Sequence, residues 1–454
     1  MEASSRQKIT NPHRGIERAL RGGQRTGRQL IEELEVSQPT LSRTIRELTS
    51  KVTMFRVSGQ RTPYYALLRE LPLGLNPRQR IYRFLSAGNI VPFADVEFLV
   101  GGGTLERTHG GLTRIYEGLP PYMSFAAPSG FLGRQLAKGA AMEHAFPTSI
   151  KDWNDDHRVA FLFTQGVNLP GNLVFGDVAL QFEMNLLRLP GSTGKDTLDY
   201  YVEMAQQLRG ASFGSSVGGE QPKFLWIDQD TGQVIVKFAR IGSRMAELLP
   251  LEHLALNALA DAGVPAAKTK LFISEEFIFL EVVRFDRVGA KGRVGMLSAG
   301  AVDDEFFGMR DSWPEFAARC VSAGYITKQD AEHVGVMAAF SELIGNTDRH
   351  FENISMLIGE DGEYQGIAPA YDILPMRYAS IGGGGDPELV PIEPKVGTIG
   401  AVPAVWSLAA RAADKFWNAV ASMKLAAPIS PSMRELAIQN RQVAREFAAT
   451  FLVA

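Results

Sequence analysis

Apolar positions near the N-terminus recur with the spacing of short helices. Residues 14–21 and 26–35 each place apolar side chains at helical intervals, and a glycine pair at 22–23 separates the two stretches. Ser37 is suited to cap a third helix, and Pro39 falls in its first turn, where a missing N–H does no harm. The pattern predicts three short helices in succession.

The third predicted helix, residues 38–48, divides into two faces. The apolar face holds Leu41, Ile45 and Leu48. The opposite face presents polar and basic side chains of the kind that enter a major groove, namely Gln38, Thr40, Arg43 and Arg46. We therefore expect these four residues to contact DNA.

A β-hairpin is predicted next. Residues 54–57 and 64–68 read as two strands, and the turn between them carries Arg61. Three helices followed by such a basic wing resemble a winged helix-turn-helix, which predicts a DNA-binding domain over residues 1–72 with Arg61 as a further contact. The alternative is a small structural subdomain whose basic face is only solvated.

Charge is unevenly distributed along the chain. Residues 1–70 contain 13 Lys and Arg against 7 Asp and Glu, a local charge of +6, so the remainder carries −9 of the formal total of −3. A positive segment on a mildly acidic body favours a nucleic-acid partner for that segment alone.

Composition sets limits on the class of protein. With 454 residues, of which 45% are hydrophobic, the chain can bury a large core and is expected to form two or three domains. No apolar run approaches the roughly 20 residues that span a bilayer, and the polar start lacks a secretory signal, so we expect a cytoplasmic protein without a membrane partner. The single cysteine, Cys320, excludes an internal disulfide and a Cys-rich zinc site and is expected to be buried.

The rest of the chain divides into regions that differ in composition and in predicted secondary structure. Residues 77–195 mix short β-rich runs with glycine and proline and show no clear chemistry, which predicts an N-terminal subdomain of structural character. Strands and then long helices follow, so we expect a strand-rich lobe at 200–290 and a helical lobe at 291–454.

The sharpest chemical pattern lies in the predicted helical lobe. Asp348 and Asn353 are separated by four residues, and Asp372 follows 19 residues later. One carboxylate can orient a hydroxyl, while the other two side chains supply oxygen ligands of the kind that Mg²⁺ prefers. The spacing equals that of the protein-kinase catalytic loop and its later metal-binding Asp. In isolation, the same residue types also cap helices and close turns.

Signals expected of a nucleotide site precede this pattern. Residues 214–223 form a Gly/Ser loop whose N–H groups are suited to close over phosphates. Lys237 ends the next strand, 18 residues after the last loop glycine, where its ammonium would neutralise phosphates unless it is only a solvated strand-end lysine. The candidate ATP-binding residues of the loop are Ser215, Ser216, Gly218, Gly219, Gln221 and Lys223.

Two further signals complete the order of a kinase. Glu252 lies on a predicted helix and is suited to pair with Lys237, or else it is an exposed helix glutamate. Residues 277–283 read as a buried strand that runs into a polar linker, so Val283 and Phe285 are candidates for backbone contact with adenine at a hinge. Several weak signals in one fixed order favour ATP and Mg²⁺ as cofactors.

Residues 205–380 resemble the HipA-type toxin kinases. Four passages carry the resemblance: Gly-Glu-Gln-Pro-Lys at 219–223, Val-Arg-Phe-Asp-Arg at 283–287, Gly-Asn-Thr-Asp-x-His-x-x-Asn at 345–353, and Tyr-Asp-Ile-Leu at 371–374. The resemblance implies an α+β fold with the two-lobed, protein-kinase-like HipA architecture and a mostly helical C-terminal lobe. With the winged helix-turn-helix in front, the layout is similar to that of the long members of the family.

The resemblance also implies roles for single residues. Asp348 would be the catalytic base, Asn353 and Asp372 would hold Mg²⁺, Lys237 would contact the phosphates of ATP, and His350 would brace the catalytic loop.

The sequence departs from the family pattern at two places. The family's hinge commonly has Glu where this chain has Val283, which bears on ATP affinity. Of a Ser-x-Ser that some members autophosphorylate, only Ser216 remains, and we hypothesise that it is a regulatory autophosphorylation site.

The activity implied by the resemblance is transfer of the ATP γ-phosphoryl group to a serine or threonine of a translation-linked cellular protein. Growth arrest would be the output, and an antitoxin would be a further partner. Two alternatives stand beside it: a DNA-binding regulator whose kinase fold senses nucleotide, and a Mg²⁺-dependent phosphodiesterase acting on DNA. Asp348 argues against a pure sensor, which has no need of a base.

Overall fold

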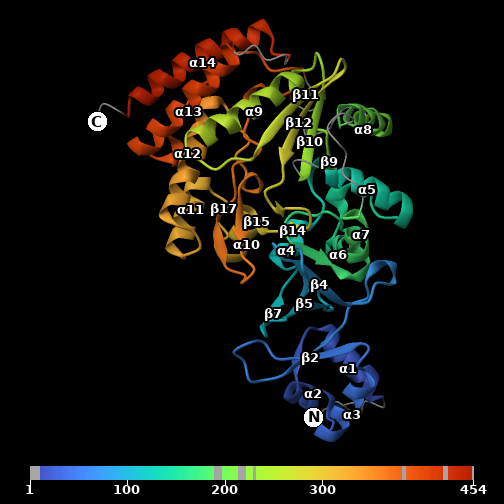
Figure 1. The fold of residues 1–454 in the computed structure, drawn as a ribbon. Helices are drawn as coiled ribbons and strands as arrows, with labels where there is room; N and C mark the ends of the chain where they lie inside the picture. The colour runs from blue at the N-terminus through green and yellow to red at the C-terminus, as the bar shows by residue number, and fades with distance from the viewer. Residues whose placement is uncertain are drawn as a thin grey trace.

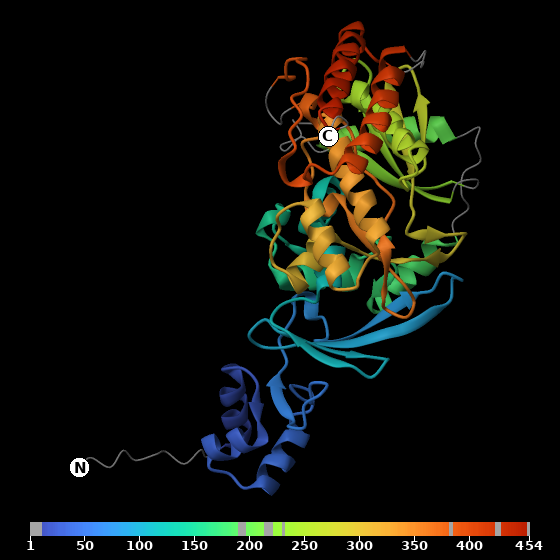
Figure 2. The ribbon, with the colours of Figure 1, turned by 90° about the vertical axis from the view of Figure 1, so that its left-hand side faces the viewer.

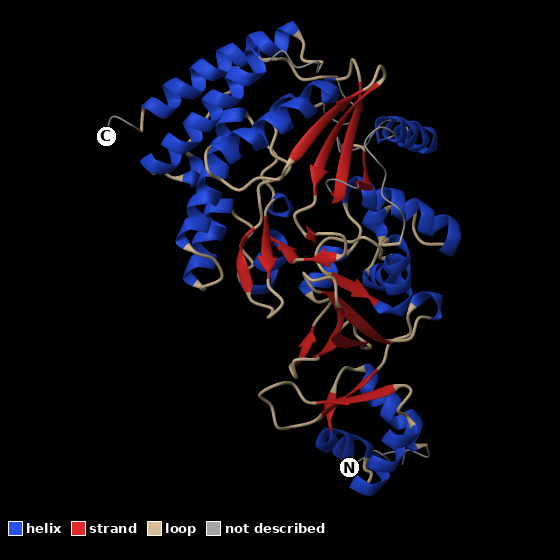
Figure 3. Ribbon diagram, viewed as in Figure 1, coloured by secondary structure: helices blue, strands red, loops and turns tan. Residues whose placement is uncertain are grey.

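The computed structural model describes residues 11–188, 197–212, 221–228, 232–380, 385–422 and 428–451. The chain forms an elongated molecule with a small N-terminal part at one end and a bundle of helices at the other (Figure 1). A five-stranded sheet and a four-stranded sheet lie between the two ends, as the ribbon coloured by secondary structure shows (Figure 3). In the ranges described, no helix has the length and apolar character needed to cross a membrane.

The N-terminal part contains the three predicted helices, and each begins at a side-chain cap. Asn11 caps α1, Thr26 caps α2 and Ser37 caps α3. The elements are α1 (Pro12–Arg21), α2 (Gly27–Leu34), α3 (Gln38–Glu47), β1 (Arg25–Thr26), β2 (Val52–Phe55) and β3 (Tyr64–Leu67). The three strands form an antiparallel sheet in the order β1-β3-β2, so the predicted hairpin is confirmed, with its first strand two residues earlier than expected.

The middle part is a five-stranded antiparallel sheet with helices packed against it. The strands follow the order β7-β6-β5-β4-β8. They are β4 (Arg78–Phe84), β5 (Ile90–Phe98), β6 (Thr104–Thr108), β7 (Thr113–Tyr116) and β8 (Leu173–Phe175). The helices are α4 (Pro121–Ala126), α5 (Gly130–His144), α6 (Asp155–Gln165) and α7 (Gly176–Leu186). Their shared core is rich in phenylalanine from β5, α6 and β8.

A second antiparallel sheet, in the order β11-β12-β10-β9, follows in the chain. Its elements are α8 (Thr197–Ser212), β9 (Lys223–Asp228), β10 (Gly232–Arg240), α9 (Arg244–Asp261), β11 (Thr269–Ile273) and β12 (Phe277–Val283). Side chains alternate between the two faces of a strand, so Val236 and Phe238 pack toward Tyr201 of α8, while Ala239 packs toward α9. Lys237 therefore shares the face that α9 covers.

The C-terminal part is mostly helical. Its helices are α10 (Ala299–Phe306), α11 (Trp313–Ser322), α12 (Lys328–Ile344), α13 (Pro403–Ser422) and α14 (Pro431–Ala449). Its strands are β13 (Arg287–Val288), β14 (Gly292–Arg293), β15 (Gly295–Ser298), β16 (Ser355–Ile358) and β17 (Tyr364–Ile367). Helix α12 is buried on nearly every side in its second half, which identifies it as the centre of this part. Cys320 is buried and free, as predicted.

The turn between β4 and β5 connects the middle part to two hairpins of the C-terminal part. Arg83 donates to the carbonyl of Glu360 at 2.7 Å, and the Ser86 N–H and hydroxyl donate to the Glu360 carboxylate, each at 2.7 Å. On the other side, the Arg293 N–H donates to the Leu85 carbonyl at 3.2 Å. The five-stranded sheet therefore touches the β13–β14 hairpin and the β16–β17 turn at once.

The N-terminal part is also fastened to the middle sheet, which lies directly beside it in both views (Figures 1 and 2). The Ser58 N–H donates to the Thr113 carbonyl at 2.9 Å, and the Thr113 N–H donates to the Ser58 hydroxyl at 2.8 Å. Arg78 reaches the Thr49 carbonyl at 2.8 Å. The first residues of the predicted wing are thus held by β7.

Candidate functional site

Lys237 is the centre of a buried ionic group. Its Nζ atom lies 2.6 Å from Glu252 Oε1 and 2.5 Å from Asp372 Oδ1. Lys237 is 5% exposed and Glu252 is fully buried. The predicted pairing of Lys237 with Glu252 is confirmed, and the alternative of a solvated strand-end lysine is wrong.

Local structure explains how the three side chains meet. Glu252 lies in the middle of α9, above the sheet face to which Lys237 points. The strand-like segment before Asp372 pairs with the loop after α9, because the Ala267 N–H donates to the Ala370 carbonyl at 2.9 Å. Asp372 itself has a φ of +56°, a left-handed conformation that Asp tolerates better than most residues. The turn at Asp372 is thereby fixed against α9.

The charges of this group stabilise one another. Burial opposes ionisation of Asp372, yet the Lys237 ammonium, helped by Lys223, holds the pKa of that carboxyl well below its usual range. Burial also works against the Lys237 ammonium, but the carboxylates of Asp372 and Glu252 raise its pKa above the ordinary value. Burial raises the pKa of the Glu252 carboxyl, although Lys237 opposes this. Lys237 and Asp372 are therefore a charged pair at neutral pH.

The loop after α12 carries the second set of predicted residues. Helix α12 ends at Gly345, whose φ of +76° turns the chain away from the helix axis. The Asp348 N–H then donates to the Asn346 side chain at 3.0 Å. Asn353 Nδ2 donates to the Asp348 carbonyl at 2.9 Å and lies 3.4 Å from Asp348 Oδ2. Asp348 and Asn353 are thus brought together, whereas Asn353 has no hydrogen bond to Asp372.

His350 lies between two carboxylates of the same loop. Its Nε2 atom is 3.5 Å from Asp348 Oδ1, and its Nδ1 atom is 3.3 Å from Glu352 Oε2. The hydrogen bond to Glu352 is the largest of the effects that raise the pKa of His350. The same bond, together with Arg310, lowers the pKa of Glu352 to about 2. A protonated imidazole is therefore favoured beside Asp348.

Two supporting residues were not predicted from the sequence. Arg310 donates to Glu352 Oε1 at 2.6 Å and to Asp304 Oδ2 at 2.6 Å. The Trp313 indole N–H donates to the His350 carbonyl at 3.1 Å. Both come from the loop and helix α11, which precede the catalytic-loop motif by more than 30 residues. The spacing of residues within the motif cannot predict contacts with residues that lie outside the motif.

The predicted phosphate-loop residues are only partly within the described structure. Ser215, Ser216, Gly218 and Gly219 lie outside the described residues. Gln221 is 9% exposed. Its Nε2 atom, like Glu252 Oε2, is buried and has no hydrogen-bond partner in the structure as described. Lys223 lies opposite Lys237 in the β9–β10 register. The Gln221 amide therefore offers a donor, and Lys223 and Lys237 offer positive charge, to an anionic ligand.

The predicted hinge has a different character from that expected. The Val283 N–H donates to the Lys268 carbonyl at 2.9 Å and is therefore committed to the backbone rather than free for adenine. Phe285 is half-buried against Tyr371, with ring centroids 5.6 Å apart. The Phe285 N–H has no acceptor in the described part of the chain, so it is the hinge group left for a ligand.

The charged residues of the Val-Arg-Phe-Asp-Arg passage form a buried network with residues of the middle part. Arg284 contacts Asp286 at 2.8 Å, and Arg287 contacts Asp286 at 2.6 Å. Both arginines also donate to the side-chain oxygen of Asn168, at 2.6 and 3.1 Å, and to the Leu169 carbonyl. This passage therefore holds the middle part against the four-stranded sheet.

The predicted DNA-contacting residues differ in their exposure. Gln38, Arg43, Arg46 and Arg61 are exposed. Thr40 is half-buried, and its hydroxyl lies 2.9 Å from the Ser37 hydroxyl at the start of α3. Thr40 therefore belongs to the helix cap. No ion pair engages Arg43 or Arg46 within the described ranges.

Comparisons with known proteins find similarity to toxins and to a HipA-like domain. A family model described as "YjjJ-like toxin, middle domain" matches residues 75–184, and one described as "HipA-like C-terminal domain" matches residues 215–444. Toxin YjjJ of Escherichia coli (strain K12) is 30% identical over 410 residues, which cover 88% of this chain and 90% of that protein.

Two solved structures are also similar. One is from the Shewanella oneidensis MR-1 toxin–antitoxin complex of HipA, HipB and operator DNA, with a TM-score of 0.49, 14% identity, and coverage of 81% of this chain and 97% of that chain. The other is the Helicobacter pylori proinflammatory kinase CtkA, with a TM-score of 0.37, 13% identity, and coverage of 50% and 94%.

Proposed function

The chain belongs to the HipA-like family, together with the YjjJ-like toxins, and on this premise we propose that it is a toxin kinase. It transfers the γ-phosphoryl group of ATP to a serine or threonine of a cellular protein. The observation that carries this proposal is the meeting of Lys237 with Glu252 and Asp372, three residues from separate elements. A purely structural salt bridge would not need a second carboxylate with an unpaired oxygen beside it.

The residues fit ATP and magnesium in their donor chemistry. Lys237, Lys223 and the unpaired Gln221 amide would bind phosphate oxygens, and the Phe285 N–H would meet the base. Asp372 and Asn353 supply the few hard oxygen ligands that Mg²⁺ shares with phosphates and water. When bound, Mg-ATP supplies the phosphoryl group and the counter-charge for transfer.

The acceptor side of the reaction is assigned to the loop after α12. Asp348 is the base that orients the acceptor hydroxyl and takes its proton. Its side chain is 44% exposed, which suits a group that must meet an external protein. Asn353 fixes the Asp348 backbone, and His350 braces the carboxylate from the other side.

We assign the N-terminal part to a winged helix-turn-helix, with domain borders at 1–72, 77–195, 200–290 and 291–454. Three capped helices and a hairpin in this order support the assignment, as do the exposed Arg43 and Arg46 on α3, which have no ion pair with any residue that the structure describes. DNA is therefore the proposed partner of this domain, and Arg61 is retained as a contact from the β2–β3 loop.

In the proposed biological setting, the kinase phosphorylates a protein linked to translation and thereby arrests growth, and an antitoxin holds this activity in check. The toxin name of the relative supports it. The deciding experiment compares phosphoproteomes of cells that express the wild type or Asp348→Asn. Serine or threonine sites that appear only with the wild type are expected. Identical phosphoproteomes, with both proteins folded and abundant, would reject the kinase.

A DNA-binding regulator that merely senses nucleotide is the second candidate, favoured by the exposed arginines of α3. The same comparison separates it from the kinase, because a sensor would change transcripts without new phosphosites. Plasmid nicking with Mg²⁺ and without ATP would instead point to a phosphodiesterase.

A further inference from the structure

The loop between α10 and α11 is built rigidly, although it lies on the surface. Asp303 is fully buried, and its Oδ2 atom accepts the N–H groups of Met309 and Arg310, each at 2.8 Å. The Asp303 carbonyl accepts the N–H groups of Phe307 and Gly308 at 2.8 and 2.6 Å. Gly308 and Arg310 have φ values of +66° and +46°, so the loop follows a tight and specific path.

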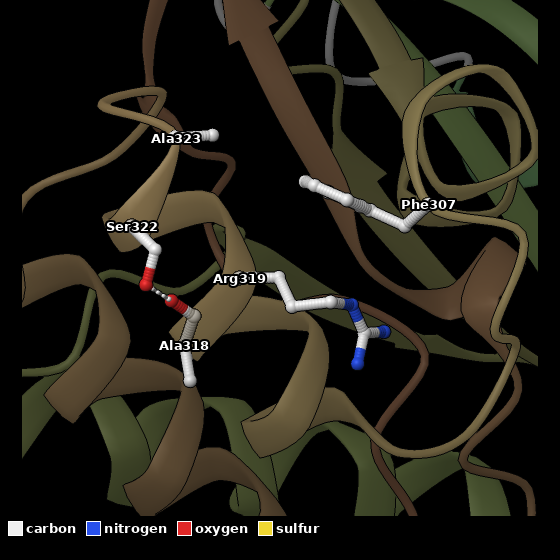
Figure 4. Close-up of a pocket in the computed structure, with 5 residues that line it drawn as sticks. All are labelled: Phe307, Ala318, Arg319, Ser322 and Ala323. Carbon is white, nitrogen blue, oxygen red and sulfur yellow. Dashed lines mark hydrogen bonds between the residues drawn. The ribbon is translucent and has the colours of Figure 1, made fainter.

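This rigid loop displays large apolar side chains. Met309 is 61% exposed and Phe306 is 48% exposed. Phe307, the residue after Phe306, borders a hollow of about 410 Å³ on the flank of α11, shown in Figure 4. It is lined by Phe307, Ala318, Arg319, Ser322 and Ala323. Exposed apolar side chains on an ordered frame, beside a concavity, are typical of a protein-binding surface.

The same loop touches the catalytic loop. Arg310, next to Met309, donates to Glu352 at 2.6 Å, and Glu352 contacts His350. The Trp313 indole at the start of α11 donates to the His350 carbonyl. A polypeptide seated on Met309 would therefore run past the residues that surround Asp348.

The charge of the segment around this loop indicates which kind of protein partner it would bind. Residues 304–319 contain four carboxylates and two guanidiniums, a net charge of −2. Both guanidiniums are already paired, Arg310 with Asp304 and Glu352 and Arg319 with Asp303 and Asp311. Burial raises the pKa of Glu305, and Arg114 of β7 opposes this. Glu315 is exposed, accepts a hydrogen bond from the Ser312 hydroxyl at 2.8 Å and has no ion pair in the described part of the chain. A partner with basic residues complements this balance.

We propose that Phe306, Met309 and the adjoining hollow form the docking surface for the acceptor protein of the kinase. The occupant is a segment of that protein with one bulky apolar residue beside basic residues: the apolar side chain enters the hollow, and a basic side chain faces Glu315. This inference rests on the proposed function, since it names a feature of that reaction's acceptor.

The test uses the full-length protein and an array of peptides with a central serine and degenerate flanks. Wild type is compared with the double variant Phe306→Ala, Met309→Ala. The matched control is Ile438→Ala, which removes a 55% exposed apolar side chain from α14, outside the docking surface. With radiolabelled ATP, we expect wild type and control to label peptides that combine an apolar residue with Lys or Arg at a fixed offset.

For such a peptide, the double variant should raise the KM at least tenfold, with the KM for ATP and the thermal midpoint unchanged. Unchanged peptide kinetics in the double variant, or a preference for acidic flanks, would overturn the docking surface while leaving the kinase in place. If the wild type labels no peptide, the proposed function fails. The docking surface is then tested with the same array in the absence of ATP, by measuring how much protein each peptide binds. Binding lost in the double variant alone supports it, and equal binding rejects it. A wild-type dimer that the double variant turns into a monomer would reassign the surface to a second copy.

Discussion

The Lys237 ammonium lies 2.5 Å from the Asp372 carboxylate, although 135 positions separate the two residues. Lys237 comes from the centre of an antiparallel sheet, and Asp372 comes from a turn with a left-handed backbone that is held by the loop after α9. The sheet and the helical part therefore share one charged pair at their junction. A substitution at either residue is therefore expected to affect both the sheet and the helical part.

Replacing Lys237 by Met is expected to destabilise the protein as well as to abolish phosphoryl transfer. The fully buried Glu252 would lose its cation, and breaking such a pair costs about 3–5 kcal/mol. Urea unfolding measures this loss. Adding Glu252→Gln to Lys237→Met should recover part of the stability and none of the activity. No recovery would show that the cost lies in packing rather than in the unpaired carboxylate.

Asp348→Asn is expected to lower phosphoryl transfer by about 10²–10⁴-fold, the usual worth of a positioned acid or base. Because the Asp348 side chain is 44% exposed, the free energy of unfolding should hardly change. Initial rates with saturating Mg-ATP and thermal melting test the two parts. A variant with wild-type rates would remove Asp348 from the mechanism.

Acid stability is expected to depend on Glu352. Its pKa falls from 4.5 to about 2 in the folded protein, because His350 and Arg310 bind the carboxylate. A depressed pKa stabilises the fold above the unfolded pKa, and that contribution is lost as the pH falls through the folded pKa. Wild type should therefore be more stable than Glu352→Gln above about pH 4.5, and the difference should vanish toward pH 2. A difference that is constant over this range would contradict the assignment.

The network around Asp286 is expected to hold the middle part in place. Asp286→Asn would leave Arg284 and Arg287 buried without their shared carboxylate, at a cost of about 3–5 kcal/mol. Hydrogen exchange should rise first around Asn168 and Leu169, which the arginines bind. Asp95→Asn is the control, because its exposed pair with Arg80 is worth little. Equal effects of the two substitutions would refute an interdomain role.

DNA binding is expected to depend on Arg43 and Arg46. If each contacts one phosphate, replacing both by Ala should reduce the slope of log affinity against log salt by about 2. Arg28→Ala serves as the control, since Arg28 is engaged by Glu32 on α2. Filter binding at several salt concentrations gives the slopes. If the slope of log affinity against log salt is the same for all variants, Arg43 and Arg46 do not contact DNA, and the DNA-binding surface lies elsewhere.

Local signals in the sequence predicted local structure well. Ser37 and Pro39 predicted the start of α3 correctly. The order of motifs also predicted that Lys237 lies near Glu252, because strand alternation and helix position are short-range properties. The catalytic-loop spacing likewise brought Asp348 to Asn353.

Long-range partners could not be predicted in this way. Arg310 binds a glutamate 42 positions away, and Arg284 binds Asn168 across 116 positions. At the hinge, backbone contact with adenine was expected at Val283 and Phe285, but the Val283 N–H is bonded to the Lys268 carbonyl. The packing role of Arg284 and Arg287 was not predicted. Such contacts depend on how domains are stacked, which no local period encodes.

The β4–β5 turn limits how far the C-terminal part can move against the five-stranded sheet. Glu360 and Arg293, both of the C-terminal part, hold this turn through Ser86 and Leu85. Arg284 and Arg287, which follow the four-stranded sheet, bind Asn168 and Leu169 of the middle part. Separating the C-terminal part from the four-stranded sheet must therefore break one of these two sets of bonds or move the five-stranded sheet as well. Since that sheet is also bonded to the N-terminal part through Ser58 and Thr113, a movement of the sheet would carry helices α1–α3 with it.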